Sequence, residues 1–243
     1  MPIRDEHRAP ARWTGLPVED RRAERRELLL DATFELLGTS GWAGTTVRAV
    51  CQQARLNPRY FYESFPDLDA LVVAVYDRLV EQLRFTVGVA VDAAGHDPAN
   101  QMRAAVETTV RFVDEDRRRA RVLYVEALGS EALNRRRIET GYDVVTLIER
   151  DAADRRGAPP SGEHIGRVTA AVLVGGFSEL LVAWLDGRID ISRQQLIDDA
   201  TELFVALIGA ATTIAGRRTR KDVSKGAPPA SFRETTMTTG GLV

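Results

Sequence analysis

The chain has 243 residues, of which 44% are hydrophobic and 28% charged, a composition that excludes disordered and collagen-like chains and allows a substantial core. A single cysteine excludes an internal disulfide, and three scattered histidines offer no metal-ligand spacing, so no metal or other cofactor is expected. The net charge of −2 excludes a strongly basic nucleic-acid coat.

No membrane helix and no secretion are expected. The longest runs without a charged residue, 168–178 and 203–216, contain 11 and 14 residues. Both are shorter than the roughly 18 residues that a bilayer span needs. The N-terminus alternates charges with prolines and lacks an apolar signal core, so a cytoplasmic location is expected.

Helical periodicity extends from about residue 20 to about residue 216 without sustained alternation of apolar and polar residues, which predicts an all-α fold. The first predicted helix, 19–40, stops before Gly41, where glycine suits a left-handed C-terminal residue. Its apolar positions recur at helical spacing at Leu29, Thr33, Leu36 and Leu37.

A second helix follows, capped by Thr45 and Thr46. Arg48 lies on its predicted solvent side. The buried side has the spacing i, i+3, i+4 and i+7 and comprises Val47, Val50, Cys51 and Ala54. Cys51 is therefore expected to be a small core residue and not a nucleophile.

A third helix is predicted from Asn57, a favourable N-cap, and Pro58, which suits the first helical position. Phe61 and Phe65 lie four residues apart and should pack inward, which turns Arg59 outward. A helix, a short turn and a second short helix with an exposed arginine form a helix-turn-helix pattern, although three helices could also simply pack together.

The stretch LLDATFELLGTSGWAGTTVRAVCQQARLNPRYFYESFPDLDAL, residues 29–71, resembles the N-terminal segment of the tetracycline-repressor (TetR) family of transcriptional regulators. The resemblance rests on residues at fixed offsets, namely Ala32, Gly41, Thr45, Thr46, Val47, Ala54, Tyr62 and Phe65. It implies DNA binding by the helix-turn-helix.

By that resemblance, Thr46 and Tyr62 contact phosphates, and Arg59 is the best candidate to read a base, since arginine can bind guanine through two hydrogen bonds. Arg59 could instead be a solvated surface charge, and Tyr60 could pack in the core. The implied DNA-binding residues are Thr45, Thr46, Arg48, Arg55, Asn57, Pro58, Arg59, Tyr60 and Tyr62.

Three residues depart from the family pattern. Arg55 replaces the usual turn glycine, so either a non-glycine residue adopts positive φ at a cost of about 1–2 kcal/mol or the turn differs. Leu68 replaces a lysine that helps to hold a phosphate, and Glu63 adds a negative charge near the expected DNA face. The arginines at 21, 22, 25 and 26 could compensate, or could simply form surface ion pairs with neighbouring carboxylates.

The predicted organisation is a flexible arm (1–18), a helix-turn-helix DNA-binding domain (19–66), a larger helical domain for ligand binding and dimerisation (67–216) and a disordered tail (217–243). In the larger domain, helices are predicted near 68–94, from Asp97-Pro98, near 117–128, from Ser130 to about 154, near 162–186 and from Ser192.

The last two of these helices carry more apolar surface than one pair can cover, so we expect them to form a four-helix bundle with a second copy. The expected interface residues are Val172, Gly175, Gly176, Leu181, Leu203, Phe204 and Leu207. A small-molecule pocket, implied by the family resemblance, has the candidate residues Phe85, Met102, Phe112, Tyr124, Tyr142, Phe177 and Trp184.

The sequence thus indicates a homodimeric, non-enzymatic regulator that binds a palindromic operator in double-stranded DNA. The resemblance implies a repressor released by a small apolar or amphipathic inducer, while activation stays open. Two alternatives remain: a helical adaptor that binds another protein, and an enzyme in which the helix-turn-helix is only a packing module. No catalytic motif supports the enzyme.

Overall fold

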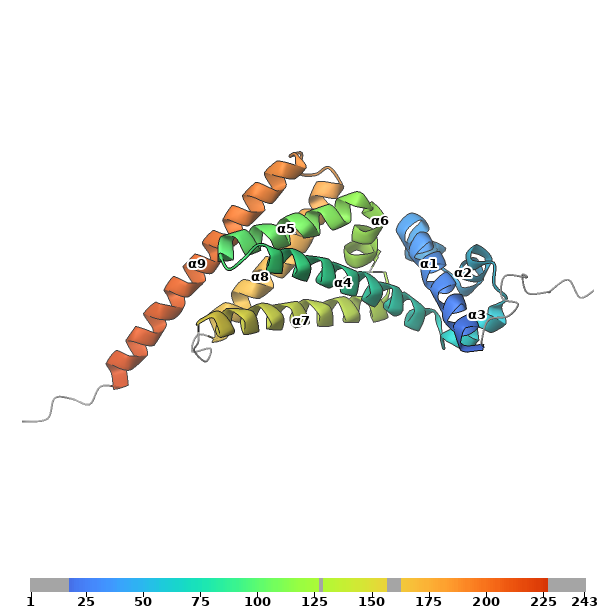
Figure 1. The fold of residues 1–243 in the computed structure, drawn as a ribbon, viewed down its shortest axis with the longest axis horizontal. Coiled ribbons are helices and arrows are strands. Elements are labelled where there is room, and N and C mark those ends of the chain that lie inside the picture. The colour runs from blue at the N-terminus through green and yellow to red at the C-terminus, as the bar shows by residue number, and fades with distance from the viewer. Residues whose placement is uncertain (1–17, 127–128, 157–162, 227–243) are drawn as a thin grey trace, which may run out of the picture.

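The computed structural model describes residues 18–126, 129–156 and 163–226, and every element in those ranges is helical. Figure 1 shows a small group of helices, here called the head, attached to a larger group, the body. The head comprises α1 (Val18–Gly44), α2 (Val47–Ala54) and α3 (Pro58–Ser64). The body comprises α4 (Leu68–Ala93), α5 (Pro98–Glu115), α6 (Arg117–Ala120), the π-helix η2 (Arg121–Val125), α7 (Glu131–Arg156), α8 (Glu163–Leu185) and α9 (Arg193–Gly226). The all-α prediction is confirmed.

Gly41 interrupts α1. Its backbone has φ 72° and ψ −174°, a conformation that is essentially restricted to glycine, and the chain resumes helical geometry for only three more residues. The predicted end of the first regular helix before Gly41 therefore agrees with the backbone. The break turns the chain toward α2.

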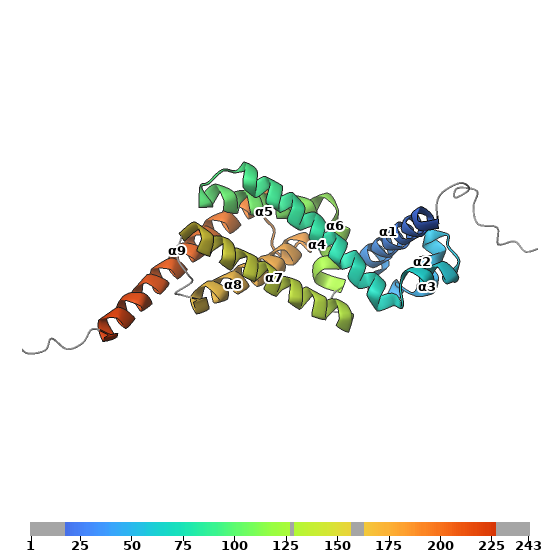
Figure 2. The ribbon, with the colours of Figure 1, turned by 60° about the horizontal axis from the view of Figure 1, so that its bottom comes forward.

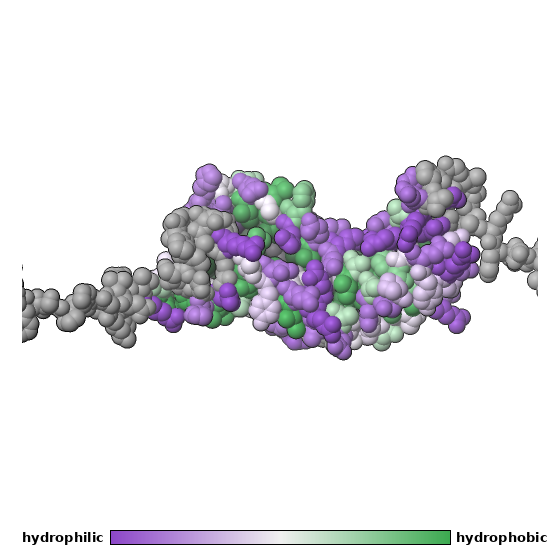
Figure 3. All heavy atoms as spheres, turned by 90° about the horizontal axis from the view of Figure 1, so that it is seen from below, coloured by the Kyte–Doolittle hydropathy of each residue, from purple (hydrophilic) through white to green (hydrophobic). Residues whose placement is uncertain are grey.

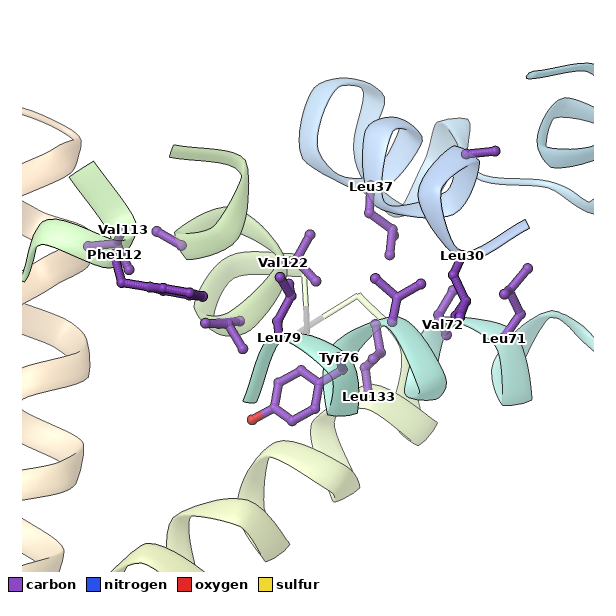
Figure 4. Close-up of a cluster of buried hydrophobic side chains, with 14 of the residues drawn as sticks. Leu30, Leu37, Leu71, Val72, Tyr76, Leu79, Phe112, Val113, Val122 and Leu133 are labelled. Atoms are coloured by element: carbon purple, nitrogen blue, oxygen red, sulfur yellow. The ribbon is translucent and has the colours of Figure 1, made fainter. Parts of the chain in front are cut away.

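The helix α4 connects the two groups of helices. Near its N-terminus, Leu71, Val72 and Val75 are fully buried in one hydrophobic cluster with Leu30 and Leu37 of α1. Further along, the same cluster continues into the body through Leu79, Val122 and Leu133, as Figure 4 shows. Head and body therefore share one continuous core.

The predicted helix at 117–128 is divided into α6 and η2. Asp116 has an extended backbone and caps α6 by accepting a hydrogen bond from the N–H of Arg118 at 3.1 Å. In η2, the N–H of Glu126 donates to the carbonyl of Arg121, five residues earlier. Periodicity could not reveal this change, because a π turn inserts one residue per turn into an otherwise helical pattern.

The helix α9 is longer than predicted. The sequence pattern placed its end near residue 216 and a disordered tail from 217, but the helix continues to Gly226. Residues 217–225 contain neither glycine nor proline, and their basic residues favour the C-terminal end of a helix. Figures 1 and 2 show this end of α9 projecting beyond the rest of the body. The predicted arm, the GAPPSG segment and the tail from 227 lie outside the described residues.

Candidate nucleic-acid interface

Thr46 holds the N-terminus of α2. Its backbone is extended, and its Oγ1 accepts a hydrogen bond from the N–H of Ala49 at 3.1 Å, a cap that stabilises a helix by about 1 kcal/mol. The side chain is exposed, and its hydroxyl hydrogen is not used in that bond, so Thr46 can also donate to a phosphate.

Thr45 is oriented differently from Thr46. It is 3% exposed, and its hydroxyl donates to the carbonyl of Gly41 at 2.8 Å, inside the head. The family resemblance implied a DNA contact for Thr45, and the structure places its side chain inside the head.

Arg55 forms the turn in a left-handed conformation, with φ 56° and ψ 41°. Its N–H bonds to the carbonyls of Cys51 and Gln52, and Leu56 N donates to Cys51 O at 2.9 Å. The turn therefore keeps the usual glycine geometry with an arginine in it, which is the first of the two outcomes that the sequence allowed. The cost is about 1–2 kcal/mol, and the side chain of Arg55 is exposed.

The aromatic pair beneath α3 anchors it. Phe61 is fully buried and Phe65 is 5% exposed, with their ring centroids 6.3 Å apart. Asn57 caps the helix by accepting from Arg59 N at 2.9 Å, and Pro58 occupies its first turn. The predicted inward packing of both phenylalanines is confirmed, so the opposite side of α3 faces solvent.

The outer surface of α2, the turn and α3, here called the head face, carries the exposed predicted DNA-binding residues. Tyr62 is 62% exposed and the Arg59 side chain 83% exposed. The exposed predicted residues are Thr46, Arg48, Arg55, Asn57, Pro58, Arg59 and Tyr62. The structure therefore brings seven of the nine together on exposed positions, leaving Thr45 buried and Tyr60 half-buried.

Glu63 is enclosed by three arginines. Its carboxylate lies 3.0 Å from Arg59 Nε and 3.6 Å from Arg25 Nη2, and its backbone carbonyl accepts from Arg22 Nη2 at 2.8 Å. These contacts offset the repulsion that Glu63 would exert on a phosphate. Of these N-terminal arginines, Arg25 pairs with the Glu63 carboxylate, whereas Arg22 bonds to a backbone carbonyl.

Tyr60 lies under the first helix. Its ring is half-buried, with the guanidinium carbon of Arg25 4.4 Å from the ring centroid. This placement favours packing between α1 and α3 for the ring of Tyr60. Leu68, the other departure near this surface, is also half-buried and packs against the core.

The seven predicted ligand-binding residues are not gathered in one place. Phe85 and Tyr142 are 72% and 65% exposed, whereas Phe112 is 7% exposed and stacks under Arg119. Trp184 donates through Nε1 to Ile191 O at 2.9 Å. A hollow of about 320 Å³ lies near α6 and contains none of the seven; its lining is Arg117, Ala120, Arg121, Val125, Val182, Leu185 and Asp186.

The predicted dimer residues divide into an exposed and a buried group. Val172 and Leu203 are 54% and 65% exposed, while Leu181 is fully buried inside the protomer and cannot meet a partner. Phe204 is half-buried against Phe177, with ring centroids 5.3 Å apart. Gly175 and Gly176 are exposed, and a Cβ on either would meet nothing within 4 Å.

A set of polar contacts between α1 and the α6–η2 segment, here called the junction, was missed by sequence reasoning. Glu126 accepts from Trp42 N at 2.6 Å and from Arg121 Nε at 2.7 Å, and Arg121 Nη1 donates to Thr39 O at 2.9 Å. Arg118 pairs with Glu35 of α1. The partners on α1 and those on α6–η2 lie about eighty residues apart, so no local pattern could pair them.

Comparison with known proteins supports the same reading of the head. Residues 29–75 match the family model described as bacterial regulatory proteins, tetR family. The HTH-type transcriptional regulator BetI of Stenotrophomonas maltophilia (strain R551-3) is 32% identical over 92 residues, which are 38% of this chain and 47% of BetI. The match thus spans about half the length of the curated relatives.

Solved structures match more of the chain. A transcriptional regulator from Pseudomonas aeruginosa PAO1 has a TM-score of 0.65 at 20% identity, covering 85% of this chain and 98% of that one. A TetR-family transcriptional regulator from Rhodococcus sp. has a TM-score of 0.62 at 19% identity, covering 76% and 98%.

Fold and head face together define a helical protein with an N-terminal helix-turn-helix joined to a larger helical body. Residues 29–75 are thus similar to the tetR family of bacterial regulatory proteins, and the solved structures share the fold of head and body.

Proposed function

We propose that this protein is a sequence-specific, DNA-binding transcriptional regulator, with residues 19–66 as its DNA-binding domain and the body as its ligand-binding and dimerisation domain. The observation that carries the proposal is the two-sided α3: Phe61 and Phe65 anchor it from beneath while Arg59 and Tyr62 are exposed. The curated regulators to which the head is related point the same way.

The energies favour Arg59 as a base-reading residue. Its ion pair with Glu63 is exposed, and such pairs are worth about 0–1 kcal/mol. A bidentate contact with guanine contributes about 1–3 kcal/mol of discrimination, so DNA can displace Glu63 from Arg59. Thr46 and Tyr62 would contact phosphates, which sets the register of α3 in the major groove.

A homodimer is part of the proposal. One short recognition helix reads few base pairs, whereas two heads about 34–36 Å apart read a palindrome. The helices α8 and α9 have long apolar segments, His164–Leu185 and Arg193–Arg218, whose windows are only 22% and 11% buried in the protomer. A second copy packed on this surface would remove it from water.

By length and composition alone, the same two helices could cross a membrane. The earlier expectation of no membrane helix counted uninterrupted runs, and a single charge such as Glu179 ends a run without making a helix polar. Core and interface helices of soluble proteins also pass this test, and the proposed cytoplasmic dimer accounts for both helices.

Ligand binding in the body would regulate the head through α4 and the junction. A ligand can shift the equilibrium between the DNA-binding and the released conformation only by the difference between its affinities for the two. A change of their ratio from 1:99 to 99:1 needs an affinity ratio of about 10⁴. We propose repression relieved by a small amphipathic molecule.

The proposal is tested by selecting genomic DNA fragments with the purified full-length protein and footprinting the enriched sequences. A protected palindrome whose half-sites are one helical turn apart is expected. Binding of all fragments alike, or a complex with a protein partner that is indifferent to Arg59→Ala and Tyr62→Ala, would instead support the adaptor.

A further inference from the structure

Glu63 contacts the side chain of the proposed base-reading residue, Arg59. The two residues lie one helical turn apart on α3, and Arg59 Nε donates to Glu63 Oε1 at 3.0 Å. Nε is the donor nearest the aliphatic part of the arginine side chain. Within the described residues, the two Nη atoms at the far end of the guanidinium make no hydrogen bond. The contact therefore restrains the guanidinium through Nε and leaves the edge between the two Nη atoms free.

Glu63 is itself restrained from the side of α1. Its other carboxylate oxygen, Oε2, lies 3.6 Å from Arg25 Nη2, and its backbone carbonyl accepts from Arg22 Nη2 at 2.8 Å. The Arg25 side chain is only 12% exposed, and its guanidinium carbon lies 4.4 Å from the centroid of the Tyr60 ring. An isolated exposed ion pair would leave Arg59 largely mobile. Here the carboxylate is anchored to a half-buried layer and can serve as a fixed point.

The exposure of the two side chains follows the same order. The Glu63 side chain is 37% exposed, whereas that of Arg59 is almost fully exposed. The carboxylate thus lies close to the surface of the head, and the guanidinium extends from the head face into solvent. A groove of DNA placed against the head face would meet the guanidinium first.

The free edge of Arg59 matches guanine. In the major groove guanine presents two neighbouring acceptors, N7 and O6, which an arginine binds through two N–H groups. The two Nη atoms offer such a pair in the plane of the guanidinium. A guanine can displace Glu63 from Arg59, but a contact through the Nη atoms needs no displacement. An unrestrained arginine loses rotamer entropy when it binds a base, and an arginine already held by Glu63 loses less.

We propose that Glu63 is a positioning residue for base recognition, which orients Arg59 so that its two Nη atoms bind guanine. This inference rests on the proposed function, since it requires that Arg59 reads a base. It gives a reason for a carboxylate on a surface that faces phosphates, where its charge alone lowers the affinity for any duplex. The head face would thus bind DNA in general more weakly and prefer guanine more strongly at one position.

The test compares Glu63→Ala with Glu63→Gln in the full-length protein. Both substitutions remove the negative charge, but only glutamine keeps a side-chain oxygen that can accept from Arg59 Nε. Neither changes the backbone carbonyl that Arg22 contacts. Anisotropy titrations use three kinds of duplex: the selected operator, operators changed at the base pair that Arg59 reads, and a random sequence.

Both variants should bind the random duplex more tightly than the wild type does, because a charge that repels phosphates is gone. Glu63→Ala should lower the discrimination between guanine and the other bases by about two- to ten-fold, since Arg59 must then be ordered on binding. Glu63→Gln should retain most of the discrimination. Equal discrimination by the two variants, or a rise in Glu63→Ala, overturns the proposal.

A double substitution tests whether Glu63 acts through Arg59. In a protein that already carries Arg59→Ala, Glu63→Ala should leave the discrimination among bases unchanged, because the residue to be positioned is absent. A further loss of discrimination in this background would mean that Glu63 acts on the DNA by another route, and would overturn the positioning role.

An NMR measurement separates this inference from the proposed function, because it needs no DNA. The Nε–H group of Arg59 should be restrained in the wild type and in Glu63→Gln, and mobile in Glu63→Ala, with the exposed Arg55 as the reference for a mobile arginine. An Arg59 as mobile as Arg55 in the wild type removes the positioning role and leaves the regulator. A restrained Arg59 in a protein that binds all duplexes alike contradicts the proposed function, and the positioning role with it.

Discussion

At the scale of single residues, Arg55 adopts a strained left-handed backbone conformation on the surface proposed to bind DNA. A left-handed arginine costs about 1–2 kcal/mol relative to glycine, and here it forms the turn between two helices of the head face. Among the residues that the structure describes, no hydrogen bond or ion pair of the exposed Arg55 side chain offsets this cost. The compensation we expect is attraction to phosphates, because each contacted phosphate releases counterions.

Replacing Arg55 by glycine should therefore change two measurements in opposite ways. Relief of strain, reduced by the entropy that glycine adds to the unfolded chain, should leave the free energy of unfolding equal or up to about 1 kcal/mol higher. Operator affinity should fall, and the slope of log affinity against log salt concentration should become shallower by about one, because about one fewer counterion is released. Urea unfolding and fluorescence anisotropy at several salt concentrations measure the two effects, and a stability loss above 1 kcal/mol would contradict the strain argument.

Arg59→Ala should weaken operator binding by about 1–3 kcal/mol and reduce discrimination among bases at one base pair of the operator. Anisotropy titrations with operator variants at that position measure it, with Arg135→Ala as a control on an exposed arginine of the body. An equal loss on operator and random DNA would mean that Arg59 contacts only phosphate.

At the scale of elements, Gly41 and the junction fix the end of α1 against the body. A Cβ at Gly41 would lie 2.7 Å from Arg121 Nη2 and 2.9 Å from Glu126 Oε1, the groups that hold Trp42 and Thr39. The glycine conformation and the long-range hydrogen bonds therefore depend on each other. Through this contact the π-helix is coupled to the head without touching the head face.

Gly41→Ala should lower the free energy of unfolding by about 1–3 kcal/mol, because its φ and ψ suit only glycine. Gly88→Ala is the matched control: Gly88 lies within α4 with nothing near an added Cβ, and should gain about 1 kcal/mol. Chemical denaturation compares the two. A neutral Gly41→Ala would show that the junction can move at little cost.

At the scale of the whole molecule, the helices α8 and α9 leave apolar surface exposed in the protomer. Val168, Val172 and Leu203 are each more than half exposed. Figure 3 shows apolar surface on the body among polar residues. Obligate dimers bury about 2,000 Å² or more, and two long helices from each copy can supply it.

If α8 and α9 form the proposed dimer interface, Leu203→Glu should convert the protein to monomer at micromolar concentration, because it would place two charges in that apolar interface. Sedimentation velocity measures the change, and operator affinity should fall with it. Leu147→Glu, at an exposed leucine of α7, should leave the dimer intact. A dimer that survives Leu203→Glu places the interface elsewhere.

Much of the head was predictable from sequence because its determinants are local. The caps at Thr46 and Asn57, the proline of α3 and the inward pair Phe61 and Phe65 are set by residues within a few positions of one another. The orientation of a side chain was less predictable where it depends on how two helices pack against each other. Thr45 turned inward to Gly41 and Tyr60 lies under Arg25, contacts that depend on how α1 meets α2 and α3.

By itself the sequence determined the helical class, the break at Gly41, the helix-turn-helix and its exposed arginine, since short-range periodicity and capping decide these. Only the tertiary structure decided that Leu181 is internal, that Glu126 joins the head to the body, and that Tyr60 lies under Arg25. Those outcomes depend on contacts between residues far apart in the chain, and helical periodicity gives the buried side of a helix but not what it packs against.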